Sequence, residues 1–494
     1  MKFGLLVQQG AAFFGGFSNP TLFLVLSFIL SVCLVWCKIP SSLREKACGL
    51  LYVLSSLSVL FFSTDPVYVA IGFDIMALAA MFLIALGGSD SGYKAFIAYA
   101  CAHFLSGALL IVGACQFTHS GFMEGVPRIL FITGLMINAA AFPLSSWVPY
   151  TYPKASRSGI IILSTFTTKI AIYVLLMMVT EGESLIQYVG IATVLYGTIF
   201  AILAKEVRLI MSYGVVGNVG LLLIAAGCGR DVLPANLLVT QMAVSVMYQT
   251  LLFMVVDSVA CDARRLSRGE LWVGTACCMV ALLNLCAFPG TASYIVKSAL
   301  LHIDTDSLNY AIFRKVYTTL GLLLFMATGV KLYWGWIKCY VHEKDSVRGF
   351  KGVSTIALAT VLLLLGLPRV WGVIFPGYSL TYSISDFIYK TMSVVAYVTC
   401  FVCFINKFTE RWDFSLLETR IYEGVVRLFE RLCGYFGSAK KDFSSKDESS
   451  EVIISICTGY VSLNHGSGPI YTASSTILWS MLFILIVFMV WIYV

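Results

Sequence analysis

The sequence predicts an all-α polytopic membrane protein with about 13–14 transmembrane helices. Hydrophobic residues make up 59% of the 494 residues and charged residues only 12%, whereas an ordinary soluble domain carries about 25% charged residues. Apolar stretches of about 20 residues, long enough to cross the hydrocarbon core, recur along the whole chain. Two of these stretches are interrupted by proline, which predicts two broken helices.

The predicted spans follow one another with short polar loops between them. They lie near residues 20–37, 48–63, 67–87, 96–115, 128–147, 158–178, 186–203, 208–227, 235–258, 271–300, 315–338, 353–375, 386–405 and 473–494. We expect two inverted five-helix repeats around the breaks, because matching interruptions in two halves of a membrane protein are typical of such repeats. The expected division is N-terminal helices (1–66), a first repeat (67–178), a second repeat (179–340), C-terminal helices (341–405), a cytoplasmic segment (406–472) and a final span (473–494).

Basic residues in the loops predict the orientation, because cytoplasmic loops carry an excess of Lys and Arg. The loops that follow the odd-numbered spans are basic, and they contain Lys38, Lys154, Lys205, Arg264 and Lys344. The loops between them are acidic or neutral, so we expect the N-terminus outside. Arg314 and Lys315, expected on an outer loop, are the main exception.

The polar excursion 406–472 interrupts the series of spans. Within it, residues 413–437 have apolar residues at helical spacing, with Arg and Glu between them. This pattern predicts an amphipathic helix lying on the membrane or on a partner subunit. Residues 438–450 are polar and charged and are expected to form a solvated linker.

The composition excludes several classes of function. The net charge of +7 fits basic cytoplasmic loops, and we expect no nucleic-acid partner. Most of the 15 cysteines lie inside apolar spans and only five histidines are present, so we expect no metal site and no cofactor. Phosphate-binding, nucleophile-elbow and metalloprotease motifs are absent from the sequence, so we expect no soluble-type catalytic site.

The two interrupted spans each have a lysine on them or soon after. Pro143 breaks the first span and Lys169 lies in the middle of the next one, while Pro289 breaks the second and Lys297 follows it. A lysine at mid-membrane costs about 2.5–3.5 kcal/mol on insertion scales and is retained mostly where it has a partner or a function. These residues are therefore candidates for an ion path.

Other ionisable residues in the spans have both a functional and a structural interpretation. Asp74 lies deep in its span and joins the candidate path. His103 is either a path residue or a hydrogen-bonded packing residue, and Lys331 either joins the path or extends to the interface. Asp257 is expected near the cytoplasmic end of its helix, in water beside Arg264 and Arg265.

The same residues carry a family resemblance over roughly residues 20–340. The chain resembles the antiporter-like, proton-translocating subunits shared by Mrp-type multisubunit cation/proton antiporters and respiratory complex I. The segments similar to family motifs begin at Gly72, Asn138, Thr168, Glu206 and Phe288. The resemblance implies that Asp74, Lys169 and Lys297 belong to a proton or cation path, with Asp74 influencing the charge of Lys169.

Several polar residues stand where the family motifs have titratable ones. They are Asn138 and Ser145 at the first break, and Asn218, Ser245 and Gln249 on later helices. Asn, Ser and Gln can hold water chains but cannot store a proton near neutral pH. The departures leave open whether the relay still operates.

The resemblance implies a membrane subunit of a monovalent cation (Na⁺)/proton antiporter. Two alternatives remain. The chain is either a membrane-arm subunit of an NADH:quinone oxidoreductase, whose redox chemistry would lie in other chains, or a structural subunit that has lost proton transfer. The expected partners are other integral membrane subunits, protons, Na⁺ and lipid, and the expected location is the bacterial inner membrane.

Overall fold

The computed structural model describes residues 19–87, 90–120, 124–262, 268–303, 308–333 and 353–367. Within these ranges the chain is helical, and eight helices are long and apolar enough to cross a membrane. Four shorter apolar helices accompany them. The predicted polytopic all-α class is therefore confirmed. The spans expected at 386–405 and 473–494 and the amphipathic segment 413–437 lie outside the described residues.

The described helices follow the predicted spans closely. The first group is α2 (Asn19–Lys38), α3 (Leu43–Phe61), α4 (Pro66–Ala85), α5 (Asp90–Ser120), α6 (Gly125–Asn138), η1 (Leu144–Ser146), α7 (Trp147–Thr151), η2 (Tyr152–Lys154) and α8 (Arg157–Met178). The second group is α9 (Ser184–Leu203), α10 (Val207–Ala226), α11 (Ala235–Asp262), α12 (Arg268–Leu285), α13 (Ala292–Leu301), α14 (Leu308–Leu324), the π-helix η4 (Phe325–Val330) and α16 (Val353–Leu365).

Local sequence explains where several helices begin. The side chain of Ser42 accepts a hydrogen bond from the backbone N–H of Glu45 at the start of α3, and Asp65 accepts one from Val67 at the start of α4. Ser156 does the same for Gly159 in α8, and Thr291 for Tyr294 in α13. Each of these caps satisfies a backbone donor that the first helical turn leaves unpaired.

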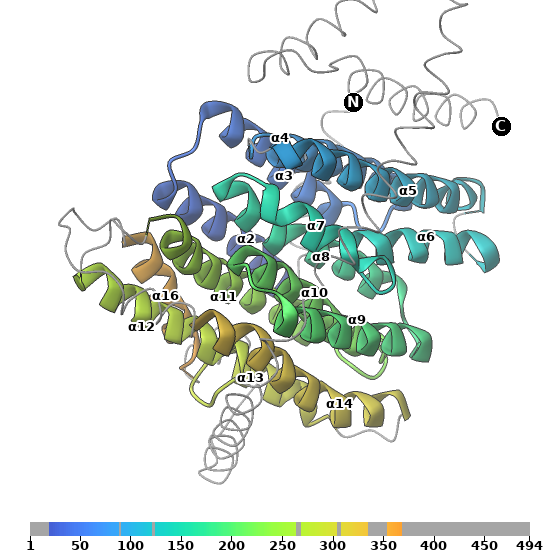
Figure 1. Cartoon of the computed structure of the whole chain (residues 1–494). Helices are drawn as coiled ribbons and strands as arrows, with labels where there is room; N and C mark the ends of the chain where they lie inside the picture. Colours follow the sequence, from blue (N-terminus) through green and yellow to red (C-terminus); the bar gives the residue numbers. More distant parts are fainter. Residues whose placement is uncertain are drawn as a thin grey trace, which may run out of the picture.

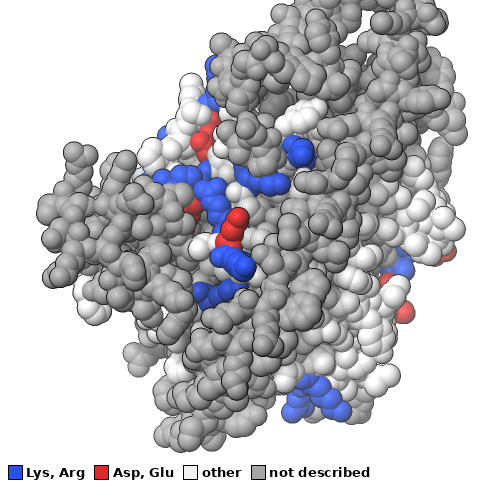
Figure 2. Space-filling view, in the orientation of Figure 1, with Lys and Arg blue, Asp and Glu red and all other residues white. Residues whose placement is uncertain are grey.

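The helices form a flat bundle in which α8, α10 and α11 are central (Figure 1). α3, α4 and α5 lie on one side of this centre, and α12, α14 and α16 lie on the other. α8 is buried over nearly its whole length, and the membrane-length part of α11 is entirely buried. The polar side chains of these two helices are therefore mostly buried inside the bundle. On the face in Figure 2, the Lys and Arg side chains of the described residues gather in a few clusters.

One expectation about the loops is wrong. Arg314 and Lys315 were expected on an outer loop, but they are exposed residues within α14, which begins at Leu308. The first turns of α14 mix apolar and basic residues and form an amphipathic extension of the span. Their two positive charges therefore belong to a helix surface and give no information about a loop.

Candidate functional site

The first helix break lies between α6 and α7. α6 ends at Asn138, and Ala140 then adopts a left-handed conformation with φ 61°. The backbone N–H of Ala140 donates to Ile137 O at 2.9 Å, and that of Ala141 donates to Met136 O at 2.9 Å. This pair of bonds is a Schellman motif, which usually has glycine at the left-handed position. The Phe142–Pro143 peptide bond that follows is cis.

The second break, between α12 and α13, has the same hydrogen-bonding pattern. Ala287 has φ 51° and donates to Asn284 O at 3.0 Å, and Phe288 donates to Leu283 O at 2.9 Å. Asn284 stands five residues before Pro289, as Asn138 stands five residues before Pro143, and both asparagines are buried. Both breaks therefore have the same capping motif before a proline and a buried amide nearby, although the left-handed alanine lies three residues before Pro143 and two before Pro289.

Lys169 lies at the centre of the bundle and is fully buried on α8. Its ammonium donates to Gln249 Oε1 on α11 at 2.5 Å and to Ser164 O at 3.1 Å. The structure therefore brings Lys169 together with Gln249, one of the positions where the chain departs from the family motif. Among the described residues no ion pair joins Asp74 to Lys169, and the Asp74 carboxylate lies against Gly107 of α5.

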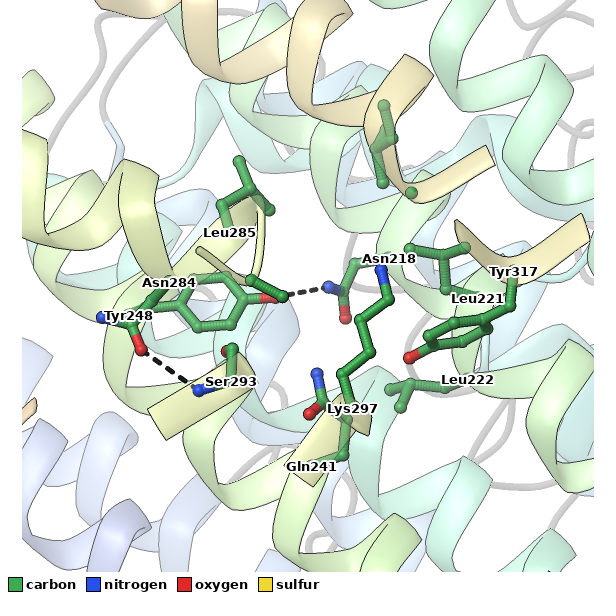
Figure 3. A pocket seen from close by; sticks show the side chains of 13 residues that line it. Asn218, Leu221, Leu222, Gln241, Tyr248, Asn284, Leu285, Ser293, Lys297 and Tyr317 are labelled. Carbon is green, nitrogen blue, oxygen red and sulfur yellow. Dashed lines mark hydrogen bonds between the residues drawn. The ribbon is translucent and has the colours of Figure 1, made fainter. Parts of the chain in front are cut away.

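Lys297 borders a cavity of about 20 Å³ between α10, α11, α12, α13 and α14 (Figure 3). Its ammonium lies 4.8 Å from the centre of the Tyr317 ring, in cation–π contact. It also packs against Gly321 of α14, where any side chain would approach it closely. On the other side of the cavity, Asn218 donates to the Tyr248 hydroxyl at 2.7 Å and Asn284 accepts from the backbone N–H of Ser293 at 3.4 Å.

Three buried polar atoms of residues that line this cavity have no hydrogen-bond partner within the part of the chain that the structure describes. They are Asn218 Oδ1, Gln241 Oε1 and Ser293 Oγ. Buried polar groups without partners are rare, and ordered water commonly satisfies them. A cavity of about 20 Å³ has room for a water molecule. The cavity is therefore suited to hold water between the Lys297 ammonium and these acceptors.

A second cluster of buried polar groups surrounds the first break. His103 stacks on Tyr99, with ring centres 4.0 Å apart, and meets Trp147 edge-on at 4.7 Å. Asn138 donates to Ser106 Oγ at 2.6 Å. Among the described residues, His103 Nε2, Asn138 Oδ1 and the buried hydroxyl of Ser145 have no hydrogen-bond partner of good geometry, and the Asn138 side chain lies near the His103 ring.

Two predicted site residues make bonds of a structural kind. Lys331 follows the π-helix and donates to the carbonyls of Ala201 at 3.0 Å, Ile202 at 2.6 Å and Ala204, at the C-terminal end of α9. A cation at this end of a helix satisfies carbonyls that lack a helical partner. Ser245 donates to Met242 O within α11. Neither interaction joins these side chains to Lys169 or Lys297.

Sequence reasoning missed a hydroxyl cluster near Lys169. Tyr52 and Tyr152 both share a hydrogen bond with Thr167, which lies two residues before Lys169 on α8. The three side chains are fully buried. Tyrosine and threonine in apolar spans give no signal in a search for charges, so only the packing of α3 and η2 against α8 reveals them.

The expectation for Asp257 is wrong. Its side chain is 1% exposed rather than in water, and it pairs with Arg157 Nε and Arg208 at 2.9 Å each. Arg157 begins α8 and Arg208 lies in the first turn of α10. Two long side chains from neighbouring helices cover the carboxylate. We call Arg157, Arg208 and Asp257 the arginine clamp.

Comparison with known proteins shows which family the central part of the chain resembles. Residues 111–322 match the family described as NADH:quinone oxidoreductase/Mrp antiporter, transmembrane. Over this segment the chain is similar to the antiporter-like family. It is 26% identical over 208 residues to NADH-quinone oxidoreductase subunit N 1 of Acidiphilium cryptum, and 24% identical over 223 residues to the putative antiporter subunit mnhD2 of Staphylococcus epidermidis.

The alignments cover 36% and 40% of this antiporter-like chain and 43% and 44% of these two relatives. The match therefore spans less than half the length of these two relatives. Both relatives match at similar identity, so the family is shared and the two branches are not separated.

Solved structures confirm the fold of the antiporter-like family. The Mrp complex from Dietzia sp. DQ12-45-1b matches with a TM-score of 0.65 at 16% identity, over 90% of this chain and 55% of that chain. Respiratory complex I from Thermus thermophilus with bound aureothin matches with a TM-score of 0.57 at 16% identity, over 72% of this chain and 86% of that chain.

Proposed function

We propose that the chain is a proton-moving membrane subunit of a multisubunit monovalent cation/proton antiporter. The observation that carries the proposal is the Lys297 cavity, in which a buried ammonium shares a water-sized space with three unpaired polar atoms. Such an arrangement holds water beside a titratable group in the middle of the membrane. It thus provides the two components that proton movement needs, a proton-binding side chain and a water molecule that carries the proton.

In this proposal, the two buried lysines are successive proton-binding groups. Lys169 holds a proton at its amine and, because Gln249 is neutral, its charge is not cancelled by an ion pair. Tyr248 neighbours Gln249 on α11 and accepts a hydrogen bond from Asn218 at the Lys297 cavity. Gln249 and Tyr248 therefore connect the surroundings of the two lysines through one helix.

Replacing each lysine by alanine tests the proposal. The whole complex is reconstituted in vesicles, and pH-linked cation transport is measured together with the amount of assembled complex. Both Lys169→Ala and Lys297→Ala should abolish transport while the complex still assembles. Lys154→Ala, which removes a cation that stacks on Tyr150 outside the path, is the matched control and should transport normally.

A structural subunit without proton transfer is the second candidate. It is favoured by Asn138, Ser145 and Gln249, which place neutral groups at the first break and beside Lys169. This candidate predicts that the lysine variants change assembly and leave transport in assembled complexes unchanged. The same experiment therefore separates the two functions.

Membership in an NADH:quinone oxidoreductase is a third possibility, supported by the match to subunit N 1 of Acidiphilium cryptum. Purification of the native complex decides between the two assemblies, because only the oxidoreductase would contain flavin and iron–sulfur subunits. We further propose a bacterial inner-membrane location, with the end that carries the arginine clamp in the cytoplasm and the N-terminus outside. Cysteine labelling of intact cells tests this orientation.

A further inference from the structure

The first break contains three side chains that converge on one stripe of α5. His103, Ser106 and Gly107 lie within about one helical turn on the same face, because residues three and four apart are neighbours on a helix. Asn138 of α6 donates to Ser106 Oγ at 2.6 Å. Asp74 of α4 lies against Gly107, where even a methyl group would collide with its carboxylate. An acid, an imidazole and an amide from three helices thus meet at this stripe.

Two polar atoms at this stripe have no hydrogen-bond partner of good geometry among the described residues. His103 Nε2 and Asn138 Oδ1 are buried and unpaired. No hydrogen bond or ion pair to Asp74 occurs among the described residues, and the side chain is only half-buried on α4. Leaving a buried donor or acceptor unsatisfied costs about 1–3 kcal/mol. Two such atoms beside a half-buried carboxylate indicate a site that gains hydrogen bonds from something besides the chain itself.

The surroundings of His103 hold the imidazole in a fixed position. Tyr99 stacks on one face of the ring and Trp147 meets it edge-on. Trp147 is itself held by a hydrogen bond from its indole N–H to Ile137 O at 3.1 Å. The other titratable groups near this stripe are the Tyr99 and Tyr152 phenols, and Asp74 is the acid nearest to it. An imidazole fixed in this way is oriented for a partner at Nε2.

We propose that Asp74 and His103 form the acid–base pair of the first half of the path, bridged by water that Ser106 and Asn138 position. This inference rests on the proposed function and assigns its first proton-binding site. The O–H bond of the protonated Asp74 carboxyl breaks, a bridging water relays the proton, and an N–H bond forms at His103 Nε2. The products are a carboxylate and an imidazolium, so the net charge of the site does not change.

Variants of the two titratable groups test the proposal in the reconstituted whole complex. His103→Gln keeps the size and polarity of the side chain but cannot carry the proton, and it should lower proton movement at least tenfold in assembled complexes. Asp74→Asn should lower it to a similar extent. His302→Gln replaces an exposed histidine at the end of α13 and should change proton movement less than twofold.

A rescue experiment distinguishes proton transfer from packing. Asn138→Lys places a titratable amine beside Ser106, so the double variant His103→Gln/Asn138→Lys should regain at least a third of the lost proton movement. A packing role for His103 predicts no rescue, because lysine does not restore the aromatic stack. Unchanged transport in His103→Gln, or absence of rescue, overturns the proposal.

If the His103→Gln complex fails to assemble, proton movement in the Asp74→Asn complex tests the acid–base pair instead. Normal proton movement in assembled Asp74→Asn complexes then overturns the acid–base pair, and a tenfold loss supports it. The proposed function is judged separately from Lys169→Ala and Lys297→Ala. If these lysine variants lose transport while the Asp74 and His103 variants keep it, the site assignment fails and the function stands.

Discussion

The buried lysines differ in what surrounds their ammonium groups. Lys169 donates to a neutral amide and a carbonyl, Lys297 lies beside an aromatic ring and a small cavity, and Lys331 donates to carbonyls at a helix end. A neutral acceptor satisfies the hydrogen bonds of an ammonium without fixing its charge, whereas three carbonyls at a helix C-terminus stabilise the charged form. Lys169 and Lys297 therefore fit proton transfer better than Lys331.

Removing the amide beside Lys169 tests this distinction. Gln249→Leu should leave the ammonium without its side-chain acceptor, destabilise the charged lysine by about 2 kcal/mol and lower proton movement at least tenfold in the assembled complex. Thr250→Val is the control, because the Thr250 hydroxyl donates only to Val246 O within its own helix. Equal effects of the two variants would mean that α11 is merely sensitive to substitution.

At the scale of elements, the two breaks repeat one backbone design. Each half-helix ends in a Schellman motif with alanine in the left-handed region, followed by a proline. The left-handed conformation costs a residue with a Cβ atom about 1–2 kcal/mol. The bundle thus maintains the same backbone strain at Ala140 and at Ala287, and a buried asparagine lies close to each of these alanines.

Glycine at the strained position should relieve the strain. Ala140→Gly should raise the free energy of unfolding of the detergent-solubilised protein by up to about 1 kcal/mol, seen as a higher thermal denaturation midpoint. Ala139→Gly, at a residue with φ −72°, is the control and should lower the midpoint because glycine is more flexible in the unfolded chain. Shifts of both variants in the same direction would refute this explanation.

At the scale of the whole molecule, the central helices are joined at one end by the arginine clamp. Asp257 of α11 holds the first turns of α8 and α10, the helices that carry Lys169 and Asn218. The opposite corner has another ion pair, Arg128 with Glu183, whose side chains are 37% and 29% exposed. Burial makes the clamp sensitive to loss of one partner, while exposure makes the second pair weak.

Removing the carboxylate of the arginine clamp should therefore lower the free energy of unfolding much more than removing the carboxylate of the exposed Arg128–Glu183 pair. Asp257→Asn leaves two arginines facing an uncharged amide and should lower the free energy of unfolding by about 3–5 kcal/mol. Glu183→Gln should lower it by less than about 1 kcal/mol. Thermal denaturation of the solubilised protein measures both, and a small effect of Asp257→Asn would show that water already screens the clamp.

Much of this architecture is predictable from sequence because apolar length and proline placement are local signals. The spans, both breaks and the burial of Lys169 follow from them. The clamp was missed because its members are 100 and 49 positions apart in the chain. The contact between Lys169 and Gln249 was also missed, since an amide in an apolar span does not reveal what it faces.

The arginine clamp also has a consequence for the biogenesis of the protein. Both arginines precede Asp257 in the chain, so they leave the ribosome before their shared acid exists. The clamp can close only after α11 has entered the bilayer, and until then α8 and α10 lack the ion pairs that join them to α11. Insertion intermediates that end before α11 should thus be extracted from membranes and degraded more readily than those that include it. The order of synthesis therefore determines when the centre of the bundle becomes rigid.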